Sequence, residues 1–165
     1  MNLPHFVKGC MLFISGCLFV ATVSAKTNEY NESPLQVTVS NKDANIPLTE
    51  PVHVYVVKVT NKSTQAVIFR LQASNVNCSS HNNPVDLSQE IISEENTTGT
   101  VSNTSSKTIL PPNGTVEFTL RLIRPLNTPL NSWNCTQLTA IGLTNNLVSN
   151  ETIVESFIPD PKDFR

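Results

Sequence analysis

The stretch Val52–Ala73, VHVYVVKVTNKSTQAVIFRLQA, constrains the fold most, because two runs of β-branched and aromatic residues flank a short polar break. Such side chains fit a pleated, half-buried surface. The second run, from Val67, alternates apolar and polar residues, which predicts a strand with one buried face. The first run is apolar on both faces, which predicts a central strand covered on both sides. The break at 60–65 is short and polar, so we predict a β-hairpin at the centre of a β-sandwich.

Alternating segments elsewhere predict further strands at 35–40, 115–124, 136–144 and 151–158. No segment shows a sustained period of 3.6 residues. About seven strands, joined by connections of unequal length, predict an all-β, immunoglobulin-like Greek-key β-sandwich in preference to a barrel.

Three segments are less regular. Residues 86–91 fit either a helical turn begun by Asp86 or a short edge strand. The polar segment 94–107 has almost no side chain that could fill a core, so we predict a surface loop or a disordered tip. The proline-bound tail 159–165 is predicted to be extended.

Residues 1–25 resemble a signal peptide. Lys8 supplies positive charge, Gly9–Val23 is apolar, and Val23-Ser24-Ala25 places small residues at the two positions that signal peptidase reads. Fifteen apolar residues are few for a membrane span, which needs about 20. We therefore predict cleavage before Lys26, a single domain over 26–165, and no membrane span in the mature chain. The alternatives are an uncleaved anchor, or lipid modification at Cys17 that would leave an apolar stub beside the lipid.

Charge excludes some classes of partner. Removal of the leader leaves ten basic and thirteen acidic residues, a formal charge of −3, with no run of Lys or Arg. Nucleic acids and acidic membranes select basic patches, so neither partner is expected. Export and this weak charge together predict a secreted or periplasmic protein.

Two cysteines, Cys78 and Cys135, remain in the mature chain. An even pair in an exported protein predicts one disulfide. It would close a loop of 57 positions, which is worth about 4 kcal/mol in the chain-entropy model. A reactive thiol or a metal site is the alternative, although neither cysteine has neighbouring ligands at the usual spacing.

Catalytic and metal-binding patterns are scarce. The mature chain has two histidines, His53 and His81, and no methionine, which disfavours a blue-copper site. It has no nucleophile elbow, phosphate-binding glycine loop or zinc-protease motif. We therefore predict no enzyme, no catalytic residue, no cofactor and no metal. The alternative is an enzyme or metal carrier that uses His53, His81 and Cys78.

Glycosylation sequons are more frequent than composition alone would give, with eight present against about four expected. If the source is a eukaryote or its virus, the candidate glycan acceptors are Asn31, Asn61, Asn96, Asn103, Asn113 and Asn150. Asn77 and Asn134 each precede a cysteine and are left out. In a bacterium the excess would reflect turns in which Asn, Ser and Thr bond to the backbone.

Two turn sequences carry a family resemblance. An apolar strand runs into Val59-Thr60-Asn61-Lys62-Ser63, and Leu110-Pro111-Pro112-Asn113-Gly114 precedes another strand. Together they resemble bacterial immunoglobulin-like accessory domains, a layout found in periplasmic chaperones and in cell-surface adhesion or spacer modules. The resemblance covers about 40 residues and includes no functional residue. It implies a sandwich fold, and no basic cleft of the kind a chaperone needs can be assigned.

The antibody-type signature is absent, because the single mature-chain tryptophan, Trp133, lies two residues before Cys135. We therefore expect the cysteine pair to bridge loops and not the two sheets. The function predicted is a non-catalytic exported module that binds a protein or glycan partner. The alternatives are a structural or spacer component of the envelope, or a secreted glycoprotein. An exposed sheet edge would favour binding, and blunted edges would favour the spacer.

Overall fold

A computed structural model of the chain describes residues 33–40, 49–79, 81–93, 102–144 and 146–164. The predicted leader, 1–25, lies outside these residues. The described elements are β1 (Leu35–Val39), β2 (Val52–Asn61), β3 (Val67–Val76), β4 (Ser88–Ser93), β5 (Thr108–Leu110), β6 (Thr115–Ile123), β7 (Ser132–Gly142), β8 (Thr152–Ile158) and η1 (Pro161–Phe164).

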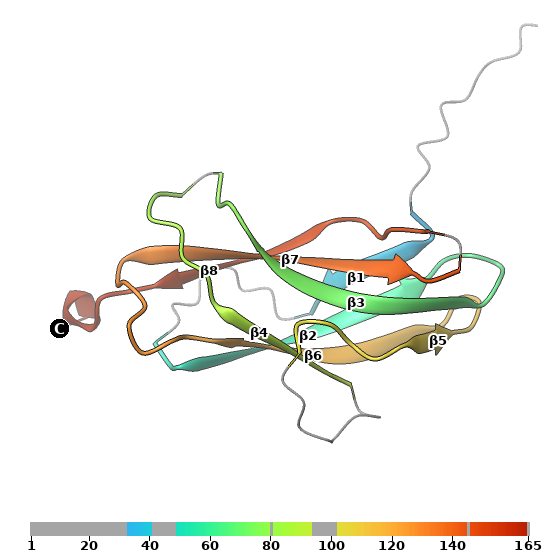
Figure 1. Cartoon of the computed structure of the whole chain (residues 1–165), viewed down its shortest axis with the longest axis horizontal. Coiled ribbons are helices and arrows are strands. Elements are labelled where there is room, and N and C mark those ends of the chain that lie inside the picture. The colour runs from blue at the N-terminus through green and yellow to red at the C-terminus, as the bar shows by residue number, and fades with distance from the viewer. Residues whose placement is uncertain (1–32, 41–48, 80, 94–101, 145, 165) are drawn as a thin grey trace, which may run out of the picture. The chain divides into compact units, whose positions relative to one another are not determined.

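The strands form two antiparallel sheets packed face to face (Figure 1). The first has the order β1-β2-β6-β4 and the second has the order β5-β3-β7-β8. These orders match the A-B-E-D and C-F-G sheets of the immunoglobulin fold, with β5 added at the edge beside β3. The prediction of an all-β, immunoglobulin-like Greek-key β-sandwich is confirmed.

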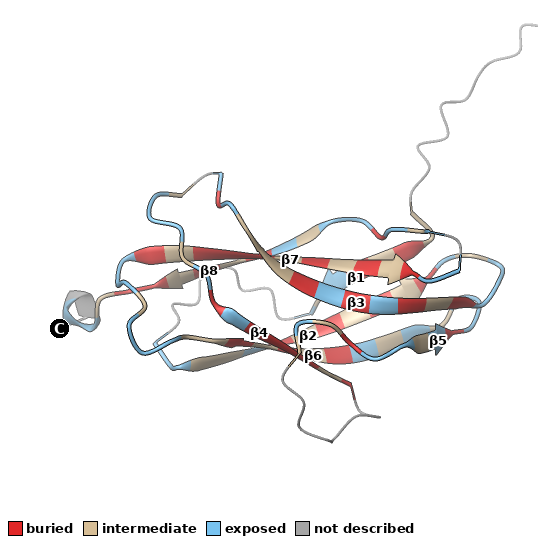
Figure 2. Ribbon diagram, viewed as in Figure 1, coloured by how far each residue is buried: buried red, intermediate tan, exposed pale blue. Residues whose placement is uncertain are grey.

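The core lies between the sheets and takes alternate residues from each strand (Figure 2). Phe69 of β3 and Phe118 of β6 meet edge to face across the two sheets, with ring centroids 6.1 Å apart. In β6, the alternation that predicted a strand over 115–124 holds, since Phe118, Leu120 and Leu122 are buried. The core is therefore the one that period-2 patterning predicts.

The hairpin predicted over Val52–Ala73 is wrong. β2 pairs with β1 and β6, whereas β3 pairs with β5 and β7, so the link at 62–66 crosses from one sheet to the other. The side chain of Asn61 shapes this crossing, because its Nδ2 donates to the carbonyl oxygens of Gln65, Leu110 and Pro111. β2 is also not covered on both faces, since Val54 is 46% exposed on its outer side.

The less regular segments are ordered differently from prediction. Residues 88–93 form β4 at the edge of the first sheet, which confirms the edge-strand alternative over the helical turn. β5 was not predicted, and β7 begins at Ser132, four residues before the predicted strand. Within the predicted polar loop, 94–101 lies outside the described residues, but 102–107 packs on the fold and buries Ser105. The tail contains the short 3-10 helix η1, so it is not fully extended.

Side chains close one lateral side of the sandwich, where β1 would otherwise present a bare edge. Asn150 Oδ1 accepts the amide of Val37 at 2.7 Å, and Asn150 Nδ2 donates to the Val37 carbonyl at 3.1 Å. The Thr152 hydroxyl donates to the same carbonyl at 2.8 Å. Asn150 thus replaces a strand partner for Val37 and ties the first sheet to the second.

The segment 102–105 closes the opposite side. The amide of Ile91 in β4 donates to the Ser102 carbonyl, and the amide of Ala73 in β3 donates to the Asn103 carbonyl, each at 2.8 Å. Ser105 bonds to Leu71 of β3 through both its amide and its Oγ. This segment therefore links the edge strand β4 to the part of β3 that β5 leaves unpaired. Both strands thereby lose groups that a foreign strand could pair with.

Candidate binding surface on the second sheet

The disulfide joins Cys78 to Cys135, with their Cα atoms 5.4 Å apart. Cys135 lies in β7 opposite Val76 of β3, and Cys78 follows β3 by two residues. The bridge therefore ties two neighbours within one sheet, on the face turned away from the core. The predicted pairing is confirmed, although only one end lies in a loop. The bond also removes Cys78 as a free thiol or metal ligand.

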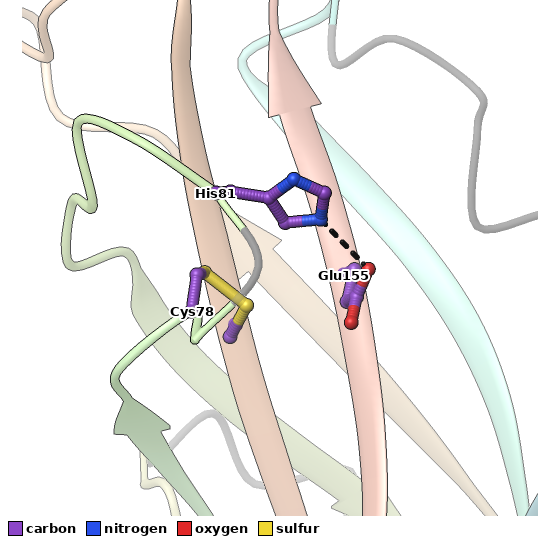
Figure 3. A network of polar contacts seen from close by, with 4 residues as sticks. Cys78, His81 and Glu155 are labelled. Carbon is purple, nitrogen blue, oxygen red and sulfur yellow. Dashed lines mark hydrogen bonds and ion pairs between the residues drawn. A yellow bond between two sulfur atoms is a disulfide. The ribbon is translucent and has the colours of Figure 1, made fainter.

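His81 lies beside this bridge and connects it to β8 (Figure 3). Its amide donates to the Cys78 carbonyl, and its Nε2 lies 3.0 Å from Glu155 Oε2. Its ring stacks on the Trp133 ring, with centroids 3.7 Å apart and planes 6° from parallel. The ring centroids of Trp133 and Phe157 are 5.0 Å apart. Because His81 covers one face of the Trp133 ring, that face is closed to a stacked sugar or base.

The loop that carries His81 is fixed to β7 by backbone hydrogen bonds. The amide of Val85 donates to the Trp133 carbonyl, and the Trp133 amide donates to the Asn83 carbonyl. Asn83 has a positive φ of 56°, a conformation that asparagine tolerates better than most residues. The disulfide, the backbone bonds and the His81–Glu155 contact together hold a rigid aromatic cluster of His81, Trp133 and Phe157.

Of the three residues named for the alternative enzyme or metal site, His81 lies beside Cys78, but His53 does not join them. His53 lies in β2 of the first sheet, and its ring centroid is 4.8 Å from that of Tyr55. Burial lowers the pKa of His53 from its usual value. His81 lies over the second sheet. Within the described part of the chain, no group of three His, Cys, Asp or Glu side chains could hold a metal ion.

The other end of the same sheet face carries aliphatic side chains. Ile68 of β3 lies opposite Ile109 of β5, and on its other side the Leu143 amide donates to the Ile68 carbonyl. Ile141 lies opposite Val148. Ile109 is 66% exposed, Val148 52% and Leu143 41%. We call Ile68, Ile109, Ile141, Leu143 and Val148 the aliphatic patch. The sequence did not predict this patch, because alternation within a strand does not show which strands share a sheet.

The candidate glycan acceptors divide by burial. Asn61 is fully buried with its amide bonded to three carbonyls, so a glycan does not fit there in the folded state. Asn103 and Asn150 are exposed, but their amides donate to the carbonyls of Ala73 and Val37. Asn113 is exposed in the β5–β6 turn. Asn31 and Asn96 lie outside the described residues.

Comparison with known proteins gives a general likeness of fold. The sequence matches no protein-family model and no curated protein. Among solved structures, a FixG-related protein from Vibrio parahaemolyticus is 15% identical with a TM-score of 0.48, over 78% of this chain and 96% of that one. The human F-spondin reeler domain is 15% identical with a TM-score of 0.43, over 76% and 90% of the two chains.

A third similar structure is WR4, a C. elegans member of the MSP family, at 10% identity and a TM-score of 0.39, over 77% of this chain and 99% of that one. At these values the three structures assign no family and no function to the chain. Among the described residues, no helix has the length and apolar character needed to cross a membrane.

Proposed function

We propose that this chain is an exported, non-catalytic β-sandwich module that binds a protein partner through the outer face of its second sheet. The observation that carries the proposal is the aliphatic patch, in which three side chains more than two-fifths exposed gather at one end of a sheet. Grouped exposed apolar side chains of this kind are typical of interaction sites. The patch shares its face with the aromatic cluster, and aromatic residues are enriched at protein interfaces.

The disulfide supports export, because disulfides persist in oxidising compartments outside the cytosol. A predicted signal peptide over 1–25 and the predicted single domain over 26–165 agree with this location. A protein partner is favoured over a glycan because His81 already covers one face of the Trp133 ring, which leaves less of the ring for a sugar to stack on.

A matched pair of variants tests the proposal. Ile109→Glu places a charge in the aliphatic patch, and Val54→Glu places the same charge on an exposed β-branched residue of the opposite sheet. Each variant is used to capture partners from extracts of the source organism, beside the unchanged chain. We expect a protein that is retained by the unchanged chain and by Val54→Glu and lost with Ile109→Glu. Equal capture by all three would remove the patch as the binding surface.

A structural or spacer role is the second candidate, and the closed lateral sides favour it. Asn150 and the segment 102–105 bond to groups on β1, β3 and β4 that strand addition would need. If no partner depends on the aliphatic patch, the spacer role becomes the better proposal.

A further inference from the structure

Three described sequons share a hydrogen bond between the asparagine and the hydroxyl two residues later. Ser63 Oγ donates to Asn61 Oδ1 at 2.7 Å, and Thr136 Oγ1 donates to Asn134 Oδ1 at 2.8 Å. Asn150 Nδ2 donates to Thr152 Oγ1 at 3.0 Å. In these tripeptides the residues that define a sequon therefore serve as one hydrogen-bonding unit.

The amides of the same three asparagines also complete the fold. Asn134 is fully buried, and its Nδ2 donates to Asn75 Oδ1 at 2.8 Å and to the Val85 carbonyl at 2.9 Å. Asn61 likewise donates inward, and Asn150 uses its amide on Val37 and Thr152. A glycan replaces one of the two amide hydrogens, so it would break bonds on which the local structure depends.

Asn113 differs from these three in each respect. It is exposed in a turn closed by the Gly114 amide, which donates to the Pro111 carbonyl at 3.0 Å. Asn113 follows a proline and has a φ of 56°, which is the combination favoured at the two central positions of a type II turn. Among the described residues its side chain has no hydrogen-bond partner, and the Thr115 hydroxyl bonds to Thr60 Oγ1 instead.

We propose that, among the sequons in the described part of the chain, Asn113 is the position that carries an N-linked glycan, while Asn61, Asn134 and Asn150 are structural and stay unmodified. The sugar donor would be a polyisoprenyl-diphosphate oligosaccharide. Asn113 Nδ2 loses one hydrogen as a proton and bonds to the anomeric carbon of the sugar. The bond from that carbon to the phosphate oxygen breaks, and the lipid diphosphate leaves with the electron pair. This inference rests on the proposed export of the chain.

The test is expression of the full chain in a eukaryotic secretory host, with peptide mapping of the secreted protein by mass spectrometry. Three forms are compared: the unchanged chain, Asn113→Gln, and Leu126→Asn. The last creates a control sequon with Thr128 at a fully exposed loop position. We expect a glycan on Asn113 that an endoglycosidase removes, its loss in Asn113→Gln, and unmodified Asn61, Asn134 and Asn150.

Two results would overturn the inference while leaving export intact. One is a bare Asn113 in a chain whose control sequon is glycosylated. The other is a folded, secreted protein with a glycan on Asn61, Asn134 or Asn150. If instead no form is secreted and the control sequon of the retained chain is also bare, the chain does not enter the secretory pathway, and the proposed export fails together with the inference.

Discussion

The hydroxyl of Tyr55 in β2 lies 3.0 Å from the Oγ of Ser156 in β8, and this buried hydrogen bond joins the two sheets through the core. Tyr55 is 1% exposed and Ser156 is fully buried. Tyr55→Phe keeps the ring but leaves the Ser156 hydroxyl unpaired, so we expect the free energy of unfolding to fall by about 1–3 kcal/mol. Urea unfolding measures this loss. The double variant Tyr55→Phe/Ser156→Ala should recover part of it, and no recovery would contradict the pairing.

The disulfide should account for a large part of the stability. Replacing Cys78 and Cys135 together by Ala opens a loop of 57 positions, and the chain-entropy model gives a loss of about 4 kcal/mol. Both sulfurs lie outside the core, so the variant should keep the near-ultraviolet circular dichroism of the folded chain at low temperature. An unchanged denaturation midpoint would show that the bridge does not constrain the unfolded state.

Asn150 should hold β1 in place. Asn150→Ala removes two hydrogen bonds to the Val37 backbone, so we expect a loss of about 1–3 kcal/mol. Faster hydrogen exchange at the Val37 amide should accompany it, because β1 opens before the core. Asn127→Ala is the matched control, since it removes the same side chain from an exposed position that does not have a positive φ. If the two variants are equally stable, the hydrogen bonds between Asn150 and Val37 do not contribute to stability.

Acid should destabilise the fold through His53. Burial lowers its pKa below the usual 6.5, so the folded state binds fewer protons than the unfolded state. The contribution of His53 is fully present above pH 6.5 and is lost as the pH falls from there toward the lowered pKa. Melting temperatures measured from pH 7.5 to 5 should fall less for His53→Gln than for the unchanged chain. Parallel curves would exclude His53 as the cause.

Local patterning predicted strands better than it predicted their partners. The alternation in 115–124 identified β6 almost to the residue, because burial on one face leaves a direct period-2 signal. The same signal cannot say which strand lies alongside. The break after Asn61 has the length and polarity of a hairpin turn, yet the buried Asn61 amide selects a crossing between sheets.

The site was predictable only in part. The pairing of Cys78 with Cys135 followed from their number and from predicted export. The contact between His81, Trp133 and Glu155 depends on three segments far apart in sequence, so no local pattern indicates it. The structural role of the sequon asparagines was hidden for a similar reason, since Val37 and Asn150 are 113 positions apart.

The pair of hydrogen bonds between Asn150 and the Val37 backbone also has a mechanical consequence. Ser33 bonds to the carbonyl of Val148, which lies in the link before β8, whereas η1 follows the end of β8. The two ends of the described fold therefore lie toward opposite ends of that strand. A pull between them would run lengthwise and load β1 in shear against β2. Under such tension the ladder between β1 and β2, reinforced from the side by Asn150 and Thr152, would bear the force before the core does.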